Sequence, residues 1–543
     1  MSGATVPESE IIAAAASPSA GIALPRIWAA LCAVLCGVLY FLAFPGIDIW
    51  PLGFVALIPL RLALVGQTPK RAFWLGWLSG LTMISLGFYW MVDMMRQFSG
   101  FSTPICMGML LIVNSFQAGR MGLFAWLFVR GERRYSAGIV WLCALVTSEL
   151  VFPVLFFWSF GAVVHGQSVF TQLAEVGGIY AVALVMAAAN FGLGEFAVAR
   201  LQNRPADLRA ALPYLLVPVV AALYGVLRIH QTDARVARAP KAMVGLVQAN
   251  MSLTGKRSYP NEGMRRHLSA TQMLTAKQPL DLVVWSETSV MGAMLQDEAN
   301  AVIPRAFAAR LHVPLLFGVV LVKKVTDARE YAYFNSALIT DVNGQVHGRY
   351  DKQELVPFSE HMPLGREIPS LYEISPNSGK FEPGESDAPL PLGEHRIGTL
   401  ICNDDAVPAL ANRVTQDSNT DLLANLTNDA WFGDTTEPWI HLALAKFRAI
   451  EHRRFFVRST NSGVSAFIDP VGRVLATTNT FKEETLVHQI AWLRGRTPYE
   501  LLGTYPYWLA GLFAVYAAFK KRGARTGDAG RALLRSLWPR SEA

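Results

Sequence analysis

The stretch Arg396-Ile-Gly-Thr-Leu-Ile-Cys402-Asn-Asp-Asp405 has the pattern of a strand that runs directly into a helix, which is typical of α/β folds. An apolar run ends at Cys402, and a helical stretch follows directly, with Asp404 or Asp405 as a suitable N-cap. A cysteine at such a strand-to-helix junction faces helix N–H groups, which favour its thiolate form. These residues leave two interpretations open: Cys402 is a reactive thiol, or it is a small apolar residue buried at a strand end.

Cysteine usage singles out the same position. The chain has five cysteines, and Cys402 alone lies outside the long apolar segments, so the water-facing part cannot hold an internal disulfide. The other four lie within apolar segments: Cys32, Cys36, Cys106 and Cys143.

The region around this stretch, residues 229–501, alternates between short apolar runs and amphipathic stretches, as α/β folds do. Asn343-Gly344 is a hairpin signal between two such runs. Strands are expected at 242–249, 281–286, 313–322, 334–341, 396–402, 421–427 and 464–469. Helices are expected at 261–277, 298–311, 405–416 and 437–452.

The rest of the chain is apolar enough for a membrane protein. Hydrophobic residues make up 52% of the chain and charged residues only 16%, against about 25% charged in soluble domains. Eight apolar segments approach the roughly 20 residues that cross a bilayer as a helix. They cover 26–45, 49–66, 71–95, 103–130, 137–158, 174–199, 209–228 and 502–520.

The distribution of basic residues predicts the orientation of these segments. Lysine and arginine gather in alternate loops, whereas 46–48 and 159–173 contain neither, and 96–102 contains only Arg96. The positive-inside rule therefore places both termini in the cytoplasm and residues 229–501 on the opposite face. The expected organisation is a disordered tail (1–24), a seven-helix membrane domain (25–228), an extracytoplasmic catalytic domain (229–501), an eighth membrane helix (502–520) and a basic tail (521–543).

Two further stretches in the water-facing region carry ionisable groups. Asp281-Leu-Val-Val-Trp-Ser-Glu287 runs from a buried strand into a carboxylate beside Trp285, where partial desolvation would raise its pKa toward that of a useful base. Tyr350-Asp-Lys352-Gln-Glu-Leu-Val-Pro-Phe-Ser-Glu360 sets a lysine and two glutamates among apolar residues. Taken singly, each stretch is also compatible with an exposed loop.

Taken together, the order Glu287, Lys352, Cys402 resembles the nitrilase superfamily, in which Glu, Lys and Cys form a catalytic triad on an αββα sandwich. Further motifs resemble one branch of it, the bacterial apolipoprotein N-acyltransferases, which have seven spans before this domain and one after it. These motifs are Val247-Gln-Ala-Asn250, Tyr333-Phe-Asn335-Ser336, Asn428-Asp-Ala-Trp431-Phe-Gly433, Pro438-Trp-Ile-His441, Arg448-Ala-Ile-Glu451 and Arg458-Ser-Thr-Asn-Ser-Gly463.

The resemblance implies a reaction and a set of partners. A fatty acyl chain passes from a phospholipid to Cys402 as a thioester, then to the N-terminal amine of a diacylglyceryl-cysteine on an apolipoprotein. Glu287 is the expected base, Lys352 the expected oxyanion donor, and Glu360 orients Lys352 or the amine. Asn335, Asp404 and Trp431 are expected to bind substrate. We expect a monomer in the bacterial inner membrane with its catalytic domain in the periplasm, and no metal or nucleotide cofactor, since no such motif occurs.

Polar residues within or near the apolar segments are costly in a bilayer and therefore informative. Glu149 lies in the middle of an expected span and resembles a family feature, so it is a candidate either for substrate binding or for a structural role. His165 and Gln167 lie in an outer loop where a lipid headgroup could rest. The remaining polar candidates are Asp93, Asn114, Gln117 and Arg120.

Two departures from the branch keep other functions open. Asn403-Asp404 stands where Tyr-Glu is usual, and Lys256-Arg-Ser-Tyr259 stands where a tryptophan is frequent. The alternatives are an N-acyltransferase with a different acceptor, a membrane-tethered amidohydrolase in which water resolves the acyl-enzyme, and a non-enzymatic relative that binds lipid or lipoprotein. The amidohydrolase does not explain seven upstream spans, and the intact Glu, Lys and Cys argue against the non-enzymatic relative.

Overall fold

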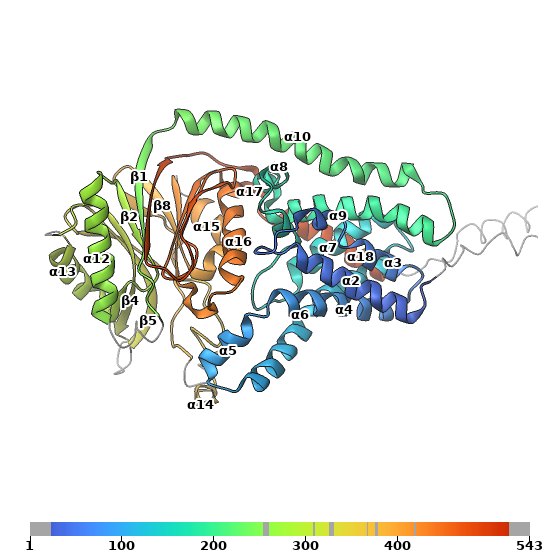
Figure 1. Ribbon diagram of the computed structural model, residues 1–543, viewed down its shortest axis with the longest axis horizontal. Coiled ribbons are helices and arrows are strands. Elements are labelled where there is room, and N and C mark those ends of the chain that lie inside the picture. Colours follow the sequence, from blue (N-terminus) through green and yellow to red (C-terminus); the bar gives the residue numbers. More distant parts are fainter. Residues whose placement is uncertain are drawn as a thin grey trace, which may run out of the picture.

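The chain folds into a helical part and a two-sheet part, joined along one side by a single long helix (Figure 1). The computed structural model describes residues 23–252, 260–307, 310–324, 331–365, 367–374, 378–416 and 420–520. The expected tails, apart from residues 23–24, and the loop Lys256–Tyr259 lie outside the described residues.

The helical part is built from the N-terminal half of the chain and one C-terminal helix. Its helices are α2 (Arg26–Leu42), η1 (Trp50–Phe54), α3 (Ile58–Leu64), α4 (Pro69–Gly87), α5 (Met91–Ser99), α6 (Thr103–Gly131), α7 (Ala137–Val151), η2 (Phe160–Val164), α8 (Ser168–Thr171), α9 (Ala174–Leu201), α10 (Leu208–Arg238) and α18 (Tyr505–Phe519).

Among the described helices, two are long and apolar enough to cross a membrane, α9 and α10. The pair α4 and α5 makes a third candidate, but the two helices are bent by 62° at the break between them. The expected span 137–158 ends as a helix at Val151, because Pro153 disfavours helical geometry at Phe152, which is extended. The expected span 49–66 is two short helices, η1 and α3. The structure thus supports an apolar helical domain, with fewer full-length spans than the eight expected.

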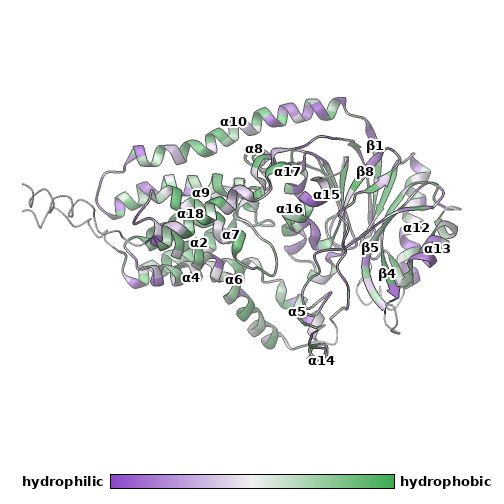
Figure 2. Cartoon of the chain, turned by 180° about the vertical axis from the view of Figure 1, so that it is seen from behind, coloured by the Kyte–Doolittle hydropathy of each residue, from purple (hydrophilic) through white to green (hydrophobic). Residues whose placement is uncertain are grey.

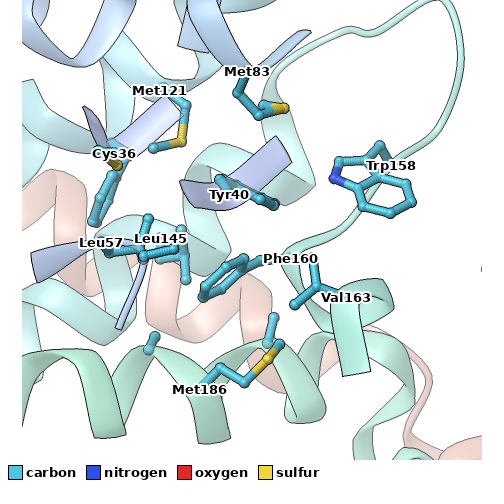
Figure 3. Close-up of a cluster of buried hydrophobic side chains, with 14 of the residues drawn as sticks. Cys36, Tyr40, Leu57, Met83, Met121, Leu145, Trp158, Phe160, Val163 and Met186 are labelled. Atoms are coloured by element: carbon cyan, nitrogen blue, oxygen red, sulfur yellow. The ribbon is translucent and has the colours of Figure 1, made fainter. Parts of the chain in front are cut away.

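Close helix contacts hold this part together. At Gly76 and Gly80 of α4, an added Cβ would lie 2.2 Å from the Met121 carbonyl oxygen and 2.9 Å from that of Ala118, so α4 and α6 approach at backbone distance. Apolar side chains from several helices fill the centre, where the ring centroids of Tyr40 and Phe160 lie 4.7 Å apart (Figure 3).

The two-sheet part has four layers, α-β-β-α. One sheet has the order β13-β1-β2-β4-β5-β6 with β3 beside β4, and the other has the order β12-β11-β10-β9-β8-β7. Helices α12 (Pro260–Lys277) and α13 (Gln296–Phe307) cover the first sheet, while α15 (Pro408–Gln416) and α16 (Glu437–His452) cover the second on the side of the helical part (Figure 1). Figure 2 shows the hydrophobic colouring concentrated in the bundle and in the strands between these helical layers.

The remaining elements complete these layers and the connections. The strands are β1 (Lys241–Gln248), β2 (Leu282–Trp285), β3 (Val290–Leu295), β4 (Leu315–Lys324), β5 (Tyr331–Thr340), β6 (Val346–Asp351), β7 (Leu390–Leu392), β8 (His395–Ile401), β9 (Leu422–Thr427), β10 (Phe455–Thr460), β11 (Ala466–Ile468), β12 (Val474–Thr477) and β13 (Glu484–Ala491). The short helices are α14 (Leu371–Ile374), η3 (Cys402–Ala406), η4 (Asp429–Phe432) and α17 (Pro498–Leu502).

The two parts meet at a break in α9. Gly177 and Gly178 leave helical geometry, and Gly178 has a φ of +65°. The Ile179 N–H, at the start of the next helical turn, donates to Glu451 Oε1 of α16 at 3.0 Å. A carboxylate therefore caps a positive helix end across the junction. Beside it, Glu175 Oε2 of α9 lies 2.6 Å from Arg453 Nε.

Candidate active site

Three strand ends bring the predicted triad together. Glu287 follows β2, Lys352 follows β6 directly, and Cys402 follows β8 directly. The Lys352 N–H donates to the Asn335 carbonyl oxygen at 2.8 Å, so the hairpin β5–β6 continues its ladder into the lysine. Glu287 packs closely on β4, where an added Cβ at Gly318 would lie 2.8 Å from Glu287 Cα. Only glycine fits at that position.

Lys352 is the centre of the site. Its side chain is 1% exposed, and Nζ lies 2.7 Å from Glu360 Oε2 and 3.8 Å from Glu287 Oε1. Burial lowers the pKa of Lys352, but negative charge at its neighbours, Glu360 and Glu287 and also Cys402 whenever its thiol is ionised, outweighs burial and raises that pKa well above its ordinary value. The site therefore holds a permanent ammonium group between two carboxylates.

Asn335 fixes those two carboxylates. Its Nδ2 donates to Glu287 Oε1 at 2.6 Å and to Glu360 Oε1 at 3.1 Å. Glu360 Oε2 also accepts the Val356 N–H at 3.0 Å. The structure thus brings together five of the eight predicted site residues, the triad with Glu360 and Asn335, and Asn335 lies where it orients the acids.

Cys402 has an unusual backbone conformation and a buried thiol whose pKa is raised. Its φ is +50°, in the left-handed region that side chains with a Cβ rarely adopt. Burial raises the pKa of the Cys402 thiol, as does the charge of Glu287, and the opposing charge of Lys352 does not compensate. The expectation of a thiolate favoured by helix N–H groups is wrong for the resting protein, because a short turn, η3, follows Cys402 and the helix α15 starts only at Pro408.

Asp404 links neighbouring segments of the site through hydrogen bonds to its carboxylate. It is fully buried, and its carboxylate accepts the Ile401 N–H at 3.0 Å, the Glu354 N–H at 2.9 Å and the Tyr350 hydroxyl at 2.9 Å. It therefore ties the end of β8 to the loop that carries Lys352. Burial raises the pKa of the Asp404 carboxyl to about 7, although Lys352 and the donors lower it. The N-cap role expected for this residue, or for Asp405, at a helix that begins at 405 is also wrong.

The other two predicted binding residues have contacts in the helical part. Trp431, in η4, is partly buried and packs against the core of the helical part. Glu149, in α7, lies 3.4 Å from Arg120 Nη2 and accepts the Ser159 hydroxyl at 2.7 Å and the Phe160 N–H at 2.7 Å. Its contacts hold the loop after α7 inside the helical part.

A buried charge cluster beneath Cys402 was not predicted. Arg458 of β10 contacts Asp405 Oδ2 at 2.7 Å and Asp429 Oδ2 at 3.2 Å, and its Nη2 lies 2.8 Å from His441 Nδ1. Because a guanidinium only donates, Nδ1 accepts, and the ring proton on Nε2 faces Asp405 at 2.7 Å. The motifs with His441, Asp429 and Arg458 were visible in the sequence, but nothing there showed that they meet.

The same cluster contains ligand types for a metal. Atoms of Asp429, Glu437 and His441 lie within 4.8 Å of one another. The guanidinium of Arg458 already lies between Asp429 and His441 and supplies the compensating cation. The residues therefore fit an ion-pair cluster and do not fit a metal site.

The αββα sandwich, with Glu, Lys and Cys at adjoining strand ends, defines the carbon-nitrogen hydrolase class, and residues 243–497 match that family. Residues 36–192 match the apolipoprotein N-acyltransferase N-terminal domain. The chain belongs to the apolipoprotein N-acyltransferase family. Its apolar helices make the protein a membrane protein.

Two relatives illustrate the match. The apolipoprotein N-acyltransferase of Geobacter metallireducens is 30% identical over 505 residues, which is 91% of this chain and 95% of the relative. That of Azotobacter vinelandii is 32% identical over 513 residues, 91% of this chain and 96% of the relative. Among solved structures, Nit3 of Saccharomyces cerevisiae, of the nitrilase superfamily, aligns with 17% identity and a TM-score of 0.37, covering 46% of this chain and 90% of its own.

Proposed function

We propose that this protein transfers a fatty acyl chain from a membrane phospholipid to the N-terminal amine of a diacylglyceryl-cysteine on an apolipoprotein. The observation that carries the proposal is the Lys352 ammonium group held between Glu287 and Glu360, beside Cys402. Two relatives that match over most of the chain bear this activity in their names. A chain with large apolar helices suits a reaction in which both substrates are lipids.

The first step forms a thioester. Glu287 removes the thiol proton as the Cys402 sulfur attacks the ester carbonyl carbon of the phospholipid. The carbonyl oxygen becomes an oxyanion, which Lys352 stabilises; one well-placed donor contributes about 3–4 kcal/mol. The intermediate then collapses, the ester C–O bond breaks, and Glu287 returns the proton to the departing glycerol oxygen. The products are a lysophospholipid and an acylated Cys402.

The second step forms the amide. The amine of the acceptor attacks the thioester carbonyl, with Lys352 again facing the oxyanion, and Glu287 takes the amine proton. The C–S bond breaks, and the proton passes to the sulfur, so the free thiol is restored. Splitting one transfer into two easier ones is the advantage of a covalent intermediate. The raised pKa of Cys402 fits this scheme, since the thiol is deprotonated only as it attacks.

We assign Glu287 as base, Lys352 as oxyanion donor, Cys402 as nucleophile and Glu360 as the residue that orients Lys352. The contacts of Asn335 support a role in holding both acids. We place Asp404 as a tether of the site. Trp431 and Glu149 are assigned to the junction and to the helical part, respectively, by their contacts.

We further propose that the protein is a multi-pass protein of the bacterial inner membrane with the two-sheet domain in the periplasm. Alternate loops rich in lysine and arginine support this orientation of all eight apolar segments. We place the start of the catalytic domain after α10, which continues to Arg238, ten residues beyond the boundary expected at 228, and its end before α18. We expect it to act as a monomer.

A two-stage incubation tests the proposal. Purified protein is mixed with phospholipid carrying a labelled acyl chain, and a diacylglyceryl-cysteine peptide is added afterwards. We expect lysophospholipid in the first stage and labelled amide in the second. Labelled free fatty acid in place of amide would identify an amidohydrolase-type reaction with water as acceptor and would overturn the proposal.

A further inference from the structure

The backbone conformation of Cys402 must be held in place by neighbouring residues, and these residues lie beneath the site. A residue with a Cβ at a φ of +50° persists only where its surroundings hold it there. The carbonyl oxygen of Cys402 accepts a hydrogen bond from Asn425 Nδ2 at 3.0 Å. Asn425 lies in the middle of β9, is fully buried, and is paired in register with Leu400 of β8 and with Arg458 of β10.

Arg458 orients that asparagine. Its Nη1 donates to Asn425 Oδ1 at 3.3 Å, which leaves the amide nitrogen of Asn425 directed at Cys402. The same Nη1 donates to Asp405 Oδ2 at 2.7 Å. Asp405 lies three residues after Cys402 in the turn η3. Arg458 therefore holds both ends of the turn that presents the sulfur.

These contacts close a ring. It runs from the Cys402 carbonyl to Asn425, from Asn425 to Arg458, from Arg458 to Asp405, and back along the chain to Cys402. All three supporting side chains are fully buried. The other terminal nitrogen of the guanidinium, Nη2, contacts Asp429 and His441. These contacts fix the orientation of the Arg458 guanidinium group.

We propose that Arg458 is a positioning residue for the nucleophile, acting through Asn425 and Asp405 to fix the left-handed turn at Cys402. It does not touch substrate. The inference rests on the proposed function only in that Cys402 is the reacting group. A buried ion pair that served folding alone would have no need of the amide bridge to the Cys402 carbonyl.

Variants with nearly unchanged side-chain volume distinguish a role in positioning Cys402 from a role in folding alone. Asn425→Asp keeps the side-chain volume and an acceptor for Arg458, but it removes the donor to the Cys402 carbonyl. Asp405→Asn removes one carboxylate charge from Arg458. Arg458→Lys keeps the charge but loses the fork that reaches several partners at once. Glu451→Gln is the matched control for Asp405→Asn, because Glu451 is a buried carboxylate paired with Arg448 at 2.8 Å in the domain junction.

The test measures Cys402 itself in the full-length protein in detergent. The rate constant for alkylation of Cys402 by iodoacetamide is followed by peptide mass spectrometry across pH, together with Tm. We expect Asn425→Asp to slow alkylation at least tenfold, or to shift its pH profile, at temperatures well below its Tm. Glu451→Gln should lower Tm while leaving the rate constant and profile of folded protein unchanged.

Two outcomes would overturn the proposal. One is an alkylation rate and pH profile in Asn425→Asp and Asp405→Asn equal to those of the unaltered protein. The other is an equal change in Glu451→Gln, which would show a general effect of losing a buried charge. Should Arg458→Lys fail to fold, the two isosteric variants still decide. Because alkylation requires no acyl transfer, failure here leaves the proposed function standing, and failure of acyl transfer leaves this test valid.

Discussion

Glu360 lies closer to Lys352 than Glu287 does, with an Oε2–Nζ distance of 2.7 Å. The glutamate that follows the lysine in sequence is thus its direct ion-pair partner. Glu287, 3.8 Å from the same nitrogen, has one oxygen bonded to Asn335, and its charge raises the pKa of Cys402 more than that of Glu360 does. This arrangement supports the proposed roles of the two acids, with Glu360 as the residue that anchors the Lys352 ammonium group and Glu287 as the residue that accepts and returns protons.

The first prediction concerns that anchor. Glu360→Gln removes the charge beside Lys352 but retains the shape, and a hydrogen bond to a charged group contributes roughly 1.5–3 kcal/mol. We expect thioester formation to slow by about 10- to 100-fold, with the effect in kcat and little change in KM, measured as lysophospholipid release. Glu354→Gln in the same loop is the control, since Glu354 has no ion pair with Lys352 among the described contacts. Equal rates in both variants would refute the anchoring role.

The second prediction concerns the resting thiol. Because burial and Glu287 raise the pKa of Cys402, the free protein holds a thiol rather than a thiolate at neutral pH. Alkylation of Cys402 without lipid should therefore be slow at pH 7 and should keep rising above pH 9, where an ordinary cysteine has largely titrated. The rate constants are read by peptide mass spectrometry between pH 6 and pH 10.5. A plateau reached below pH 8 would mean that the site stabilises the thiolate.

The third prediction concerns Asp404. In Asp404→Asn an amide nitrogen replaces one acceptor oxygen and faces a donor, which leaves buried groups unpaired at about 1–3 kcal/mol. We expect a lower Tm and a lower kcat, with KM for both substrates unchanged. Tyr350→Phe removes only one of the three donors and should have a smaller effect in the same direction. A raised KM for the acceptor at an unchanged Tm would instead support substrate binding by Asp404.

The order of elements in the two-sheet part could be predicted because its patterns are local. All seven expected strands are present, and the hairpin at Asn343-Gly344 joins β5 to β6 as expected. The strands that were missed had no local pattern of their own. For example, β10 places the buried Arg458 between Val457 and Ser459, and Asp405 and Asp429 from distant positions balance its charge.

The same distinction applies to the site. Glu287, Lys352 and Cys402 stand at strand ends, and the resemblance of their order to that of the nitrilase superfamily predicted that they meet. The role of Asn335, between two acids, depends on the pairing of β5 with β6 and could not be inferred from its neighbours. Neither could the protonated thiol, because the nearby charge of Glu287 and the burial of Cys402 arise only in the folded chain.

The fourth prediction links Glu437 to stability. Burial, together with the charge of Asp429, raises the pKa of Glu437 to about 8 in the folded protein, against about 4.3 for an unfolded glutamate. The folded state therefore binds more protons between these values, and stability should fall as pH rises from about 4.5 to 8. Glu437→Gln should flatten this slope and raise Tm at pH 8 relative to the unaltered protein.

Thermal unfolding in detergent at pH 5, 6.5 and 8 measures the effect, with Glu298→Gln on the surface helix α13 as the control. Since one pKa unit corresponds to about 1.4 kcal/mol, the gain at pH 8 should reach a few kcal/mol at most. A variant less stable than the unaltered protein at pH 8 would show that the Glu437 carboxylate is charged and paired.

The central claim is that Cys402 carries the acyl group between two lipids. Intact mass and peptide mapping after incubation with a phospholipid of defined acyl chains, without acceptor, test it directly. We predict one acyl group on Cys402, released by hydroxylamine and absent from Cys402→Ala. An acyl group that persists in Cys402→Ala, or an unmodified Cys402 in protein that still forms the amide when acceptor is added, would contradict the claim.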